Sequence, residues 1–195
     1  MDPGRKQMKQ MGDVVNIPEQ YRGVFDDYDD LVLTESEKAV FEELYKRTHA
    51  DGSEYGAVIV NVEASELFSS GEANRVYIDE NMLHTSGTKI YHSHTNETPP
   101  SIQDLKYLTH PNVDEIGVIS SNGDVYIVSV GFGEKINTRV FNQDAKKVYN
   151  DVNIEMVSNP DFFEWSIGER NYRAIREQFY RISRLYGWTM KGGRL

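Results

Sequence analysis

Residues 55–62 (YGAVIVNV) form a strongly apolar run that does most to constrain the fold of this chain. A run of this length, rich in β-branched residues, predicts a strand buried in a sheet. Residues 75–78 and 89–94 predict two further strands, the first of them weaker. The chain is therefore expected to build a β-sheet.

A β-hairpin is predicted further along the chain. Residues 116–120 and 125–130 are two β-rich runs, and the sequence Ser-Asn-Gly-Asp at 121–124 separates them. Asn-Gly between two such runs is a strong hairpin pattern, because both residues accept the positive φ of a tight turn. This hairpin adds two antiparallel strands to the predicted sheet.

Helical patterns stand on both sides of these strands. Thr34 and Glu37 make a capping box, which predicts a helix to about residue 48. Ser101 begins a short predicted helix through residue 108. Near the C-terminus an amphipathic helix is predicted, ending at Gly187, with a stripe that is either a core face or a partner face. Its apolar positions recur at three and four residues: Tyr172, Ile175, Phe179, Ile182 and Tyr186.

This order of elements predicts an α/β (α+β) fold with a mixed β-sheet flanked by helices. At 195 residues the chain suffices for one domain of ordinary size with terminal extensions. We expect an N-terminal arm over residues 1–33, with a patternless start. The main domain is expected over residues 34–133 and a C-terminal helical extension over residues 134–195.

Composition limits the functions that this chain can have. It contains no cysteine, which excludes disulfides, thiol catalysis and Cys-ligated zinc. The formal net charge of −10 argues against nucleic-acid binding as a general role, although residues 169–195 carry +5 and the preceding 168 residues −15. No segment has the length of a membrane span, and the N-terminus lacks a signal-peptide pattern. We therefore expect a soluble, cytoplasmic protein.

The chemistry of the chain is expected around His92 and His94. Residues two apart on a strand point to the same face, so the two imidazoles can converge on one ion. Asp104 follows after a short polar loop and offers a carboxylate. Two imidazoles and a carboxylate suit Zn²⁺, and three protein ligands leave one position open, as in catalytic zinc sites.

Each of these residues also has a purely structural interpretation. Two histidines on a strand can be ordinary surface or core residues. Ser101 with Asp104 is a capping box, in which the carboxylate only satisfies backbone donors at the helix start. The two interpretations are compatible, because a capped helix is a rigid platform for a ligand. The remaining histidines lie near predicted element ends and receive no role: His49, His84 and His110.

A metal-dependent hydrolase also needs a general base and a group that stabilises the oxyanion. Glu54 is our candidate base, because it immediately precedes the predicted strand at 55–62. An exposed loop glutamate is an equally good interpretation of the same residue. Glu63 and Glu66 are the alternatives, and Ser101 is the candidate hydrogen-bond donor to the oxyanion.

These residues together resemble a known family. A Glu, then His-Ser-His, then Pro-Ser-x-x-Asp, spread over two strands and a helix start, resembles the JAB/MPN fold with its JAMM metalloprotease motif. The RadC-like branch is the most similar in its loop. The resemblance covers roughly residues 35–132 by element order and is specific mainly over residues 91–104. It implies a JAB1/MPN-like (cytidine-deaminase-like) architecture.

The resemblance also implies roles for individual residues. His92, His94 and Asp104 would hold one zinc ion per chain. Glu54 would act as base and proton shuttle, and Ser101 as oxyanion donor, while metal-bound water attacks a peptide or isopeptide carbonyl. Family members often act at ubiquitin-like modifiers, so the implied partner is a protein or peptide substrate. This chain departs from the motif in having Thr95 where proline is usual and one residue fewer between the second His and the Asp.

A longer pattern resembles the JAB-like domain of phage minor head (head morphogenesis) proteins. It includes Ile17-Pro18, Glu54-Tyr55-Gly56, the run YHSHTN and Tyr186-Gly187-Trp188. This implies a phage or prophage product that is virion-associated, with a phage structural protein as partner. Two alternatives remain open: a non-catalytic structural or adaptor module that retains the ligands, and a His/Asp metal phosphoesterase or nuclease. The latter is disfavoured by the shortage of further His/Asp clusters.

Overall fold

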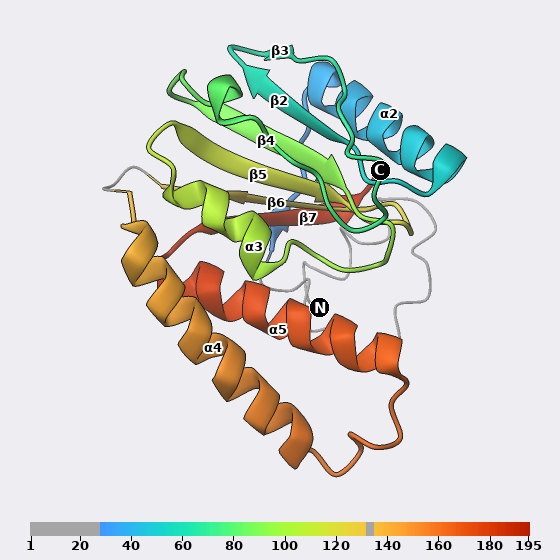
Figure 1. The fold of residues 1–195 in the computed structure, drawn as a ribbon, viewed down its shortest axis with the longest axis vertical. Helices are drawn as coiled ribbons and strands as arrows, with labels where there is room; N and C mark the ends of the chain where they lie inside the picture. Colours follow the sequence, from blue (N-terminus) through green and yellow to red (C-terminus); the bar gives the residue numbers. More distant parts are fainter. Residues whose placement is uncertain (1–27, 132–134) are drawn as a thin grey trace, which may run out of the picture.

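The computed structural model describes residues 28–131 and 135–195, which form a seven-stranded mixed sheet packed between helices (Figure 1). The strand order is β1-β7-β6-β5-β4-β2-β3. The pairs β1/β7 and β4/β5 are parallel and the other neighbours are antiparallel. The strands are β1 (Asp29–Asp30), β2 (Gly56–Val60), β3 (Glu63–Ala64), β4 (Thr88–Ser93), β5 (Val113–Ile119), β6 (Asp124–Ser129) and β7 (Thr189–Arg194). The predicted mixed sheet flanked by helices is confirmed.

Helices cover both faces of this sheet. One face carries α2 alone among the described α-helices, and the other carries α3, α4 and α5 (Figure 1). The helices are α2 (Glu35–Asp51), α3 (Ile102–Leu105), α4 (Thr138–Ser158) and α5 (Ile167–Leu185), with the 3-10 turns η2 (Glu80–Met82) and η3 (Lys106–Thr109). Alternating strand residues therefore supply two separate cores.

The capping box predicted at the start of α2 is confirmed. The Thr34 side chain accepts from the N–H of Glu37, and the Glu37 side chain accepts from the N–H of Thr34. Gly52 ends the helix with φ 73°, a left-handed conformation that glycine adopts without strain. Phe41 and Leu44 are buried against the sheet, which fixes the orientation of the helix.

A partly buried polar network lies between α2 and the sheet. We call it the α2-face network, and it consists of Glu37, Lys89, Tyr91, Glu115 and Ser129. Lys89 Nζ lies 2.6 Å from Glu37 Oε1 and 3.3 Å from Glu115 Oε1. The Tyr91 hydroxyl lies 2.5 Å from Glu115 Oε1, and Ser129 Oγ donates to Glu115 Oε2 at 2.7 Å. Both carboxylates thus have donors from neighbouring elements.

The amphipathic helix predicted near the C-terminus is α5, and its apolar stripe is a core face. Phe179 and Ile182 are fully buried against the sheet, and Tyr186 packs against the same core. The helix ends at Leu185, and Gly187 follows with φ 63°. The predicted hairpin is also confirmed, since β5 and β6 pair antiparallel around Gly123, which has φ 85°.

The structure corrects two predictions. Residues 75–78 form no strand, and Arg75 makes only an isolated bridge with Glu72. The C-terminal extension is not purely helical, because β7 joins the sheet between β1 and β6. The predicted patternless arm and Ile17-Pro18 lie outside the described residues. None of the described helices combines the length and apolarity needed to cross a membrane.

Candidate metal centre

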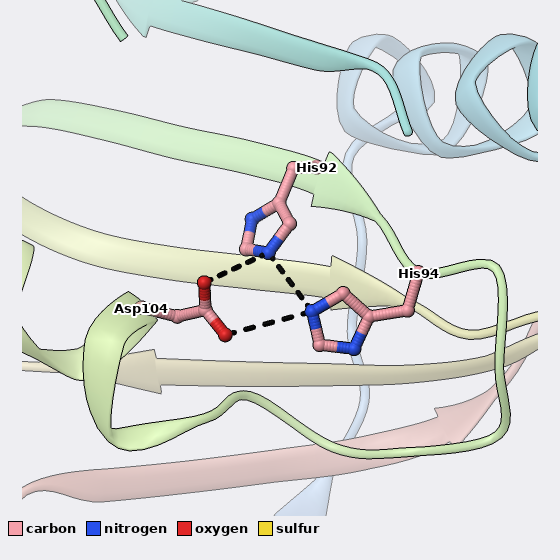
Figure 2. Close-up of side chains that lie close together, drawn as sticks. All are labelled: His92, His94 and Asp104. Carbon is pink, nitrogen blue, oxygen red and sulfur yellow. Dashed lines mark hydrogen bonds and ion pairs between the residues drawn. The ribbon is translucent and has the colours of Figure 1, made fainter. Parts of the chain in front are cut away.

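Strand β4 places both histidines on one face of the sheet. His92 belongs to β4, and the N–H of His94 donates to the Ile119 carbonyl, which continues the pairing with β5 beyond the strand end. The side chains of residues 92 and 94 therefore point to the same side, away from α2. Both are buried, with exposed fractions of 6% and 7%. The predicted convergence of the two imidazoles is found (Figure 2).

The start of α3 presents the carboxylate of Asp104 to these imidazoles. Ser101 caps the helix, its hydroxyl accepting from the N–H of Asp104 at 3.3 Å. In return Asp104 Oδ2 accepts from the N–H of Ser101 at 2.6 Å. The capping interpretation is thus correct, and the same capped helix holds the carboxylate beside the histidines. The loop that is one residue shorter than the family pattern closes without separating the three side chains.

The two imidazole nitrogens and the two oxygens of the Asp104 carboxylate lie close together. His92 Nε2 lies 3.1 Å from His94 Nε2 and 3.2 Å from Asp104 Oδ1, and His94 Nε2 lies 3.5 Å from Asp104 Oδ2 (Figure 2). Two ligands bound to zinc at about 2.05 Å with a tetrahedral angle are roughly 3.3 Å apart. The donor types suit a divalent metal ion such as zinc, and the four atoms are close enough together to hold one ion. Among the described residues this is the one group of three or more His, Asp or Glu side chains arranged in this way.

The electrostatics of the cluster favour a carboxylate between two imidazoles. Burial alone would raise the pKa of Asp104, but His92 and His94 outweigh it by charge and hydrogen bonding and hold that pKa well below its ordinary value. Burial would lower the pKa of His94, yet Asp104 and Glu54 raise it above its ordinary value. The site therefore attracts positive charge, whether a proton or a metal ion.

Glu54 lies on the same face as the two histidines. Strand β2 pairs with β4 so that Gly56 is opposite His92, and the Ser93 N–H donates to the Tyr55 carbonyl. The same register brings Glu54 opposite His94, and directly opposite residues share a face. Glu54 is buried, with an exposed fraction of 6%, so it is not the exposed loop residue of the alternative interpretation.

The carboxylate of Glu54 stands beside the cluster without belonging to it. Its pKa is raised by burial, while the charges of His94 and His92 and a hydrogen bond from the backbone of Thr95 act in the opposite direction. It is not among the atoms that lie within 4.8 Å of one another in the three-residue group. Glu54 is therefore a neighbour of the cluster rather than a member of the ligand group.

Glu63 and Glu66 do not approach the site along the sheet. Glu63 pairs with Val60 at the far end of β2, whereas His92 is opposite the first residue of that strand. Both glutamates are exposed. Glu54 is therefore the only one of the three candidate bases that the β2–β4 pairing brings to the histidines. His49, His84 and His110, to which no role was assigned, are outside the ligand group.

The sequence analysis did not identify three residues that shape the site. His94 Nδ1 lies 3.0 Å from the Thr98 carbonyl and 3.1 Å from Thr98 Oγ1. Asn96 accepts from the Thr98 N–H in an Asx-type turn, a pattern that Asn-x-Thr after the second histidine could have suggested. Gly56 allows close packing, because a Cβ there would lie 2.7 Å from Phe68 and 2.8 Å from Val76. A glycine inside an apolar strand is the sequence indication of such an approach.

We compared the chain with family models, curated proteins and solved structures, and none of the three comparisons found a match.

Proposed function

We propose that this protein is a zinc-dependent peptidase or isopeptidase of the JAMM type, built on a JAB1/MPN-like domain. The observation that carries this proposal is the buried cluster of His92, His94 and the Asp104 carboxylate, whose nitrogen and oxygen atoms lie 3.1–3.5 Å apart, with the buried Glu54 beside it. The residue order of the JAMM motif supports the same assignment. A single group of ligands among the described residues argues against a two-metal phosphoesterase.

In this proposal His92, His94 and Asp104 hold one zinc ion. A zinc ion bound by these residues would supply a Lewis acid and would activate water for attack on a carbonyl. Glu54 takes the proton of the attacking water as the new carbon–oxygen bond forms, and returns it to the leaving amine as the carbon–nitrogen bond breaks. Burial of Glu54 supports this role, because a desolvated carboxylate binds a proton more readily.

Ser101 completes the proposed machinery. Its oxygen accepts from the N–H of Asp104, so its hydroxyl proton is not used in that bond. This proton is the one that can be donated to the oxyanion formed at the carbonyl. Because Ser101 caps the helix that carries Asp104, the donor and the ligand are held by the same turn.

A second candidate is a non-catalytic adaptor module of a phage head or portal-associated protein that keeps the metal ligands. Exposed apolar side chains around the α4–α5 turn favour an interaction role. They are Ile154, Val157, Phe163 and Ile167, each more than half exposed. In this case zinc would be structural and no bond cleavage would occur.

Metal analysis of the purified chain tests the proposal first. We expect about one zinc per chain, which His92→Ala abolishes. Glu54→Gln should keep the zinc and lower the rate of cleavage by about 10²–10⁴-fold, the usual contribution of a general base. Cleavage is measured on a proteome-derived peptide library and on ubiquitin-like isopeptide conjugates, with Glu63→Gln as matched control.

The outcomes separate the two candidates. A well-folded wild type that binds no zinc contradicts both. Zinc binding without cleavage of any substrate supports the adaptor. Cleavage that survives in Glu54→Gln but is lost with zinc shows that another residue is the base.

A further inference from the structure

The side of His94 that faces away from the cluster makes two contacts with one residue. Its Nδ1 lies 3.0 Å from the backbone carbonyl of Thr98 and 3.1 Å from the hydroxyl of the same threonine. Thr98 is buried, with an exposed fraction of 8%. No step of the proposed mechanism uses this residue, and an inference about it rests on the proposed metal site.

Both contacts require a hydrogen on Nδ1. A carbonyl oxygen only accepts hydrogen bonds. The Thr98 hydroxyl lies 2.5 Å from Asn96 Oδ1, which also accepts from the Thr98 N–H at 3.0 Å. The hydroxyl proton is therefore used on Asn96, and the lone pairs of Thr98 Oγ1 remain for His94. Two acceptors facing one ring nitrogen fix the hydrogen on that nitrogen.

The consequence appears on the other side of the ring. With the hydrogen on Nδ1, a neutral imidazole has a bare Nε2. That Nε2 faces His92 Nε2 at 3.1 Å and Asp104 Oδ2 at 3.5 Å. The lone pair that a metal needs is thus directed into the cluster before any metal arrives.

The loop that carries Thr98 is anchored outside the site. The carbonyl of Asn96 accepts from the N–H of Ser121, in the turn between β5 and β6, at 2.9 Å. Asn96 in turn holds both the N–H and the hydroxyl of Thr98. A chain of contacts therefore connects the β5–β6 turn to the orientation of the His94 ring.

We infer that Thr98, held by Asn96, is a positioning residue that keeps His94 in its Nδ1–H tautomer with Nε2 directed at the metal site. Such partners of metal-bound histidines typically change metal affinity by about 10–100-fold. Thr98 acts through His94 and touches neither the metal nor the reacting groups.

Long-range ¹H–¹⁵N NMR of the histidine rings in the full chain tests this inference directly. We expect His94 to show its hydrogen on Nδ1 both in the zinc-loaded protein and, at alkaline pH, in chelator-treated protein. A hydrogen on Nε2 in the chelator-treated wild type overturns the inference. This measurement needs no variant and no activity, so it decides the inference even if the chain proves to bind no zinc.

Variants test the contribution of the hydroxyl. Thr98→Val should weaken zinc binding about tenfold, as measured by competition with a chromogenic chelator, and should broaden the His94 Nδ1–H signal. Thr98→Ser should restore both. Thr109→Val is the control, because that hydroxyl contacts Lys106 and Thr138 outside the cluster. If Thr98→Val and Thr109→Val bind zinc equally well, the hydroxyl has no positioning role; a Thr98→Val that fails to fold leaves the decision to Thr98→Ser and the wild-type spectrum.

Discussion

A polar cluster packs against each face of β4. Both clusters contain two carboxylates, but they differ in the hydrogen-bond donors available to those carboxylates. The α2-face network holds two carboxylates, and Lys89, Tyr91 and Ser129 supply donors to them. On the other face Glu54 and Asp104 share two imidazoles, and Asp104 forms its ion pairs only with these among the described residues. The first cluster is complete as it stands, whereas the second has an excess of acceptors that a cation would balance. Two carboxylates that face the same side of β4 therefore favour a cation site where imidazoles, rather than a lysine, are their charged partners.

The largest predicted effect lies in the complete cluster. Glu115→Ala removes the acceptor shared by Tyr91, Lys89 and Ser129. We expect the free energy of unfolding to fall by about 3 kcal/mol, because Ser129 loses its acceptor and Lys89 and Tyr91 keep only Glu37. Zinc content should not change. Denaturant unfolding and metal analysis measure the two quantities, and Glu115→Gln, which keeps an acceptor, should lose less. Unchanged stability in Glu115→Ala would contradict the stabilising role of the α2-face network.

In the cluster of Glu54, His92, His94 and Asp104, we expect a substitution to change metal affinity more than stability. Asp104→Asn keeps an oxygen for the N–H of Ser101, and so keeps the helix cap, but removes the charged ligand. Zinc affinity should fall more than about a hundredfold, or about 2.7 kcal/mol. The unfolding temperature of the metal-free protein should fall less than it does in Glu115→Ala, although the ion pairs of Asp104 with the two histidines are lost. A large drop in that temperature would instead mean that Asp104 is mainly a structural residue.

The smallest predicted effect is a pH-dependent contribution of Glu37, in the α2-face network, to the free energy of unfolding. Burial would raise the pKa of Glu37, but hydrogen bonds from Lys89 and Thr34 lower it from 4.5 to about 2. Because the folded pKa is depressed, Glu37 contributes stability above about pH 4.5, and this contribution is lost as the pH falls towards 2. We expect a contribution on the order of 2 kcal/mol after solvent screening. The stability difference between wild type and Glu37→Gln should shrink between about pH 6 and about pH 3, and a constant difference would contradict this.

Local patterns in the sequence predicted the parts of the molecule that local chemistry determines. The capping boxes at Thr34 and Ser101, the Asn-Gly hairpin and the stripe of α5 all depend on residues close in sequence, and the structure confirms them. The His92 and His94 pair followed from the two-residue period of a strand. Asp104 was found because the capping box places it at a helix start.

The features that the sequence analysis missed depend on contacts between residues far apart in the chain. Strand β7 has the sequence TMKGGR, which has a low intrinsic preference for strands, and it forms because β6 and β1 pair with it. Residues 75–78 have a strand-like composition but only an isolated bridge at Arg75. The register that brings Glu54 opposite His94 joins segments far apart in the chain, so no local pattern encodes it. The Asn-x-Thr pattern could have suggested the turn at Asn96, but the contact of Thr98 with His94 depends on the path of the whole loop.

Alternate residues of β4 and its continuation serve two different parts of the molecule. Its odd-numbered positions, Lys89, Tyr91 and Ser93, hold α2 in place, while the even-numbered positions continue through His92 to His94 on the other face. Substitutions of His92 and His94 can therefore change the candidate metal site without touching the contacts that hold α2 on the other face. A one-residue slip in the pairing of this strand would exchange the two sets and destroy both clusters together. A protein engineer who wished to retune the metal site would edit alternate residues and leave the length of the strand untouched.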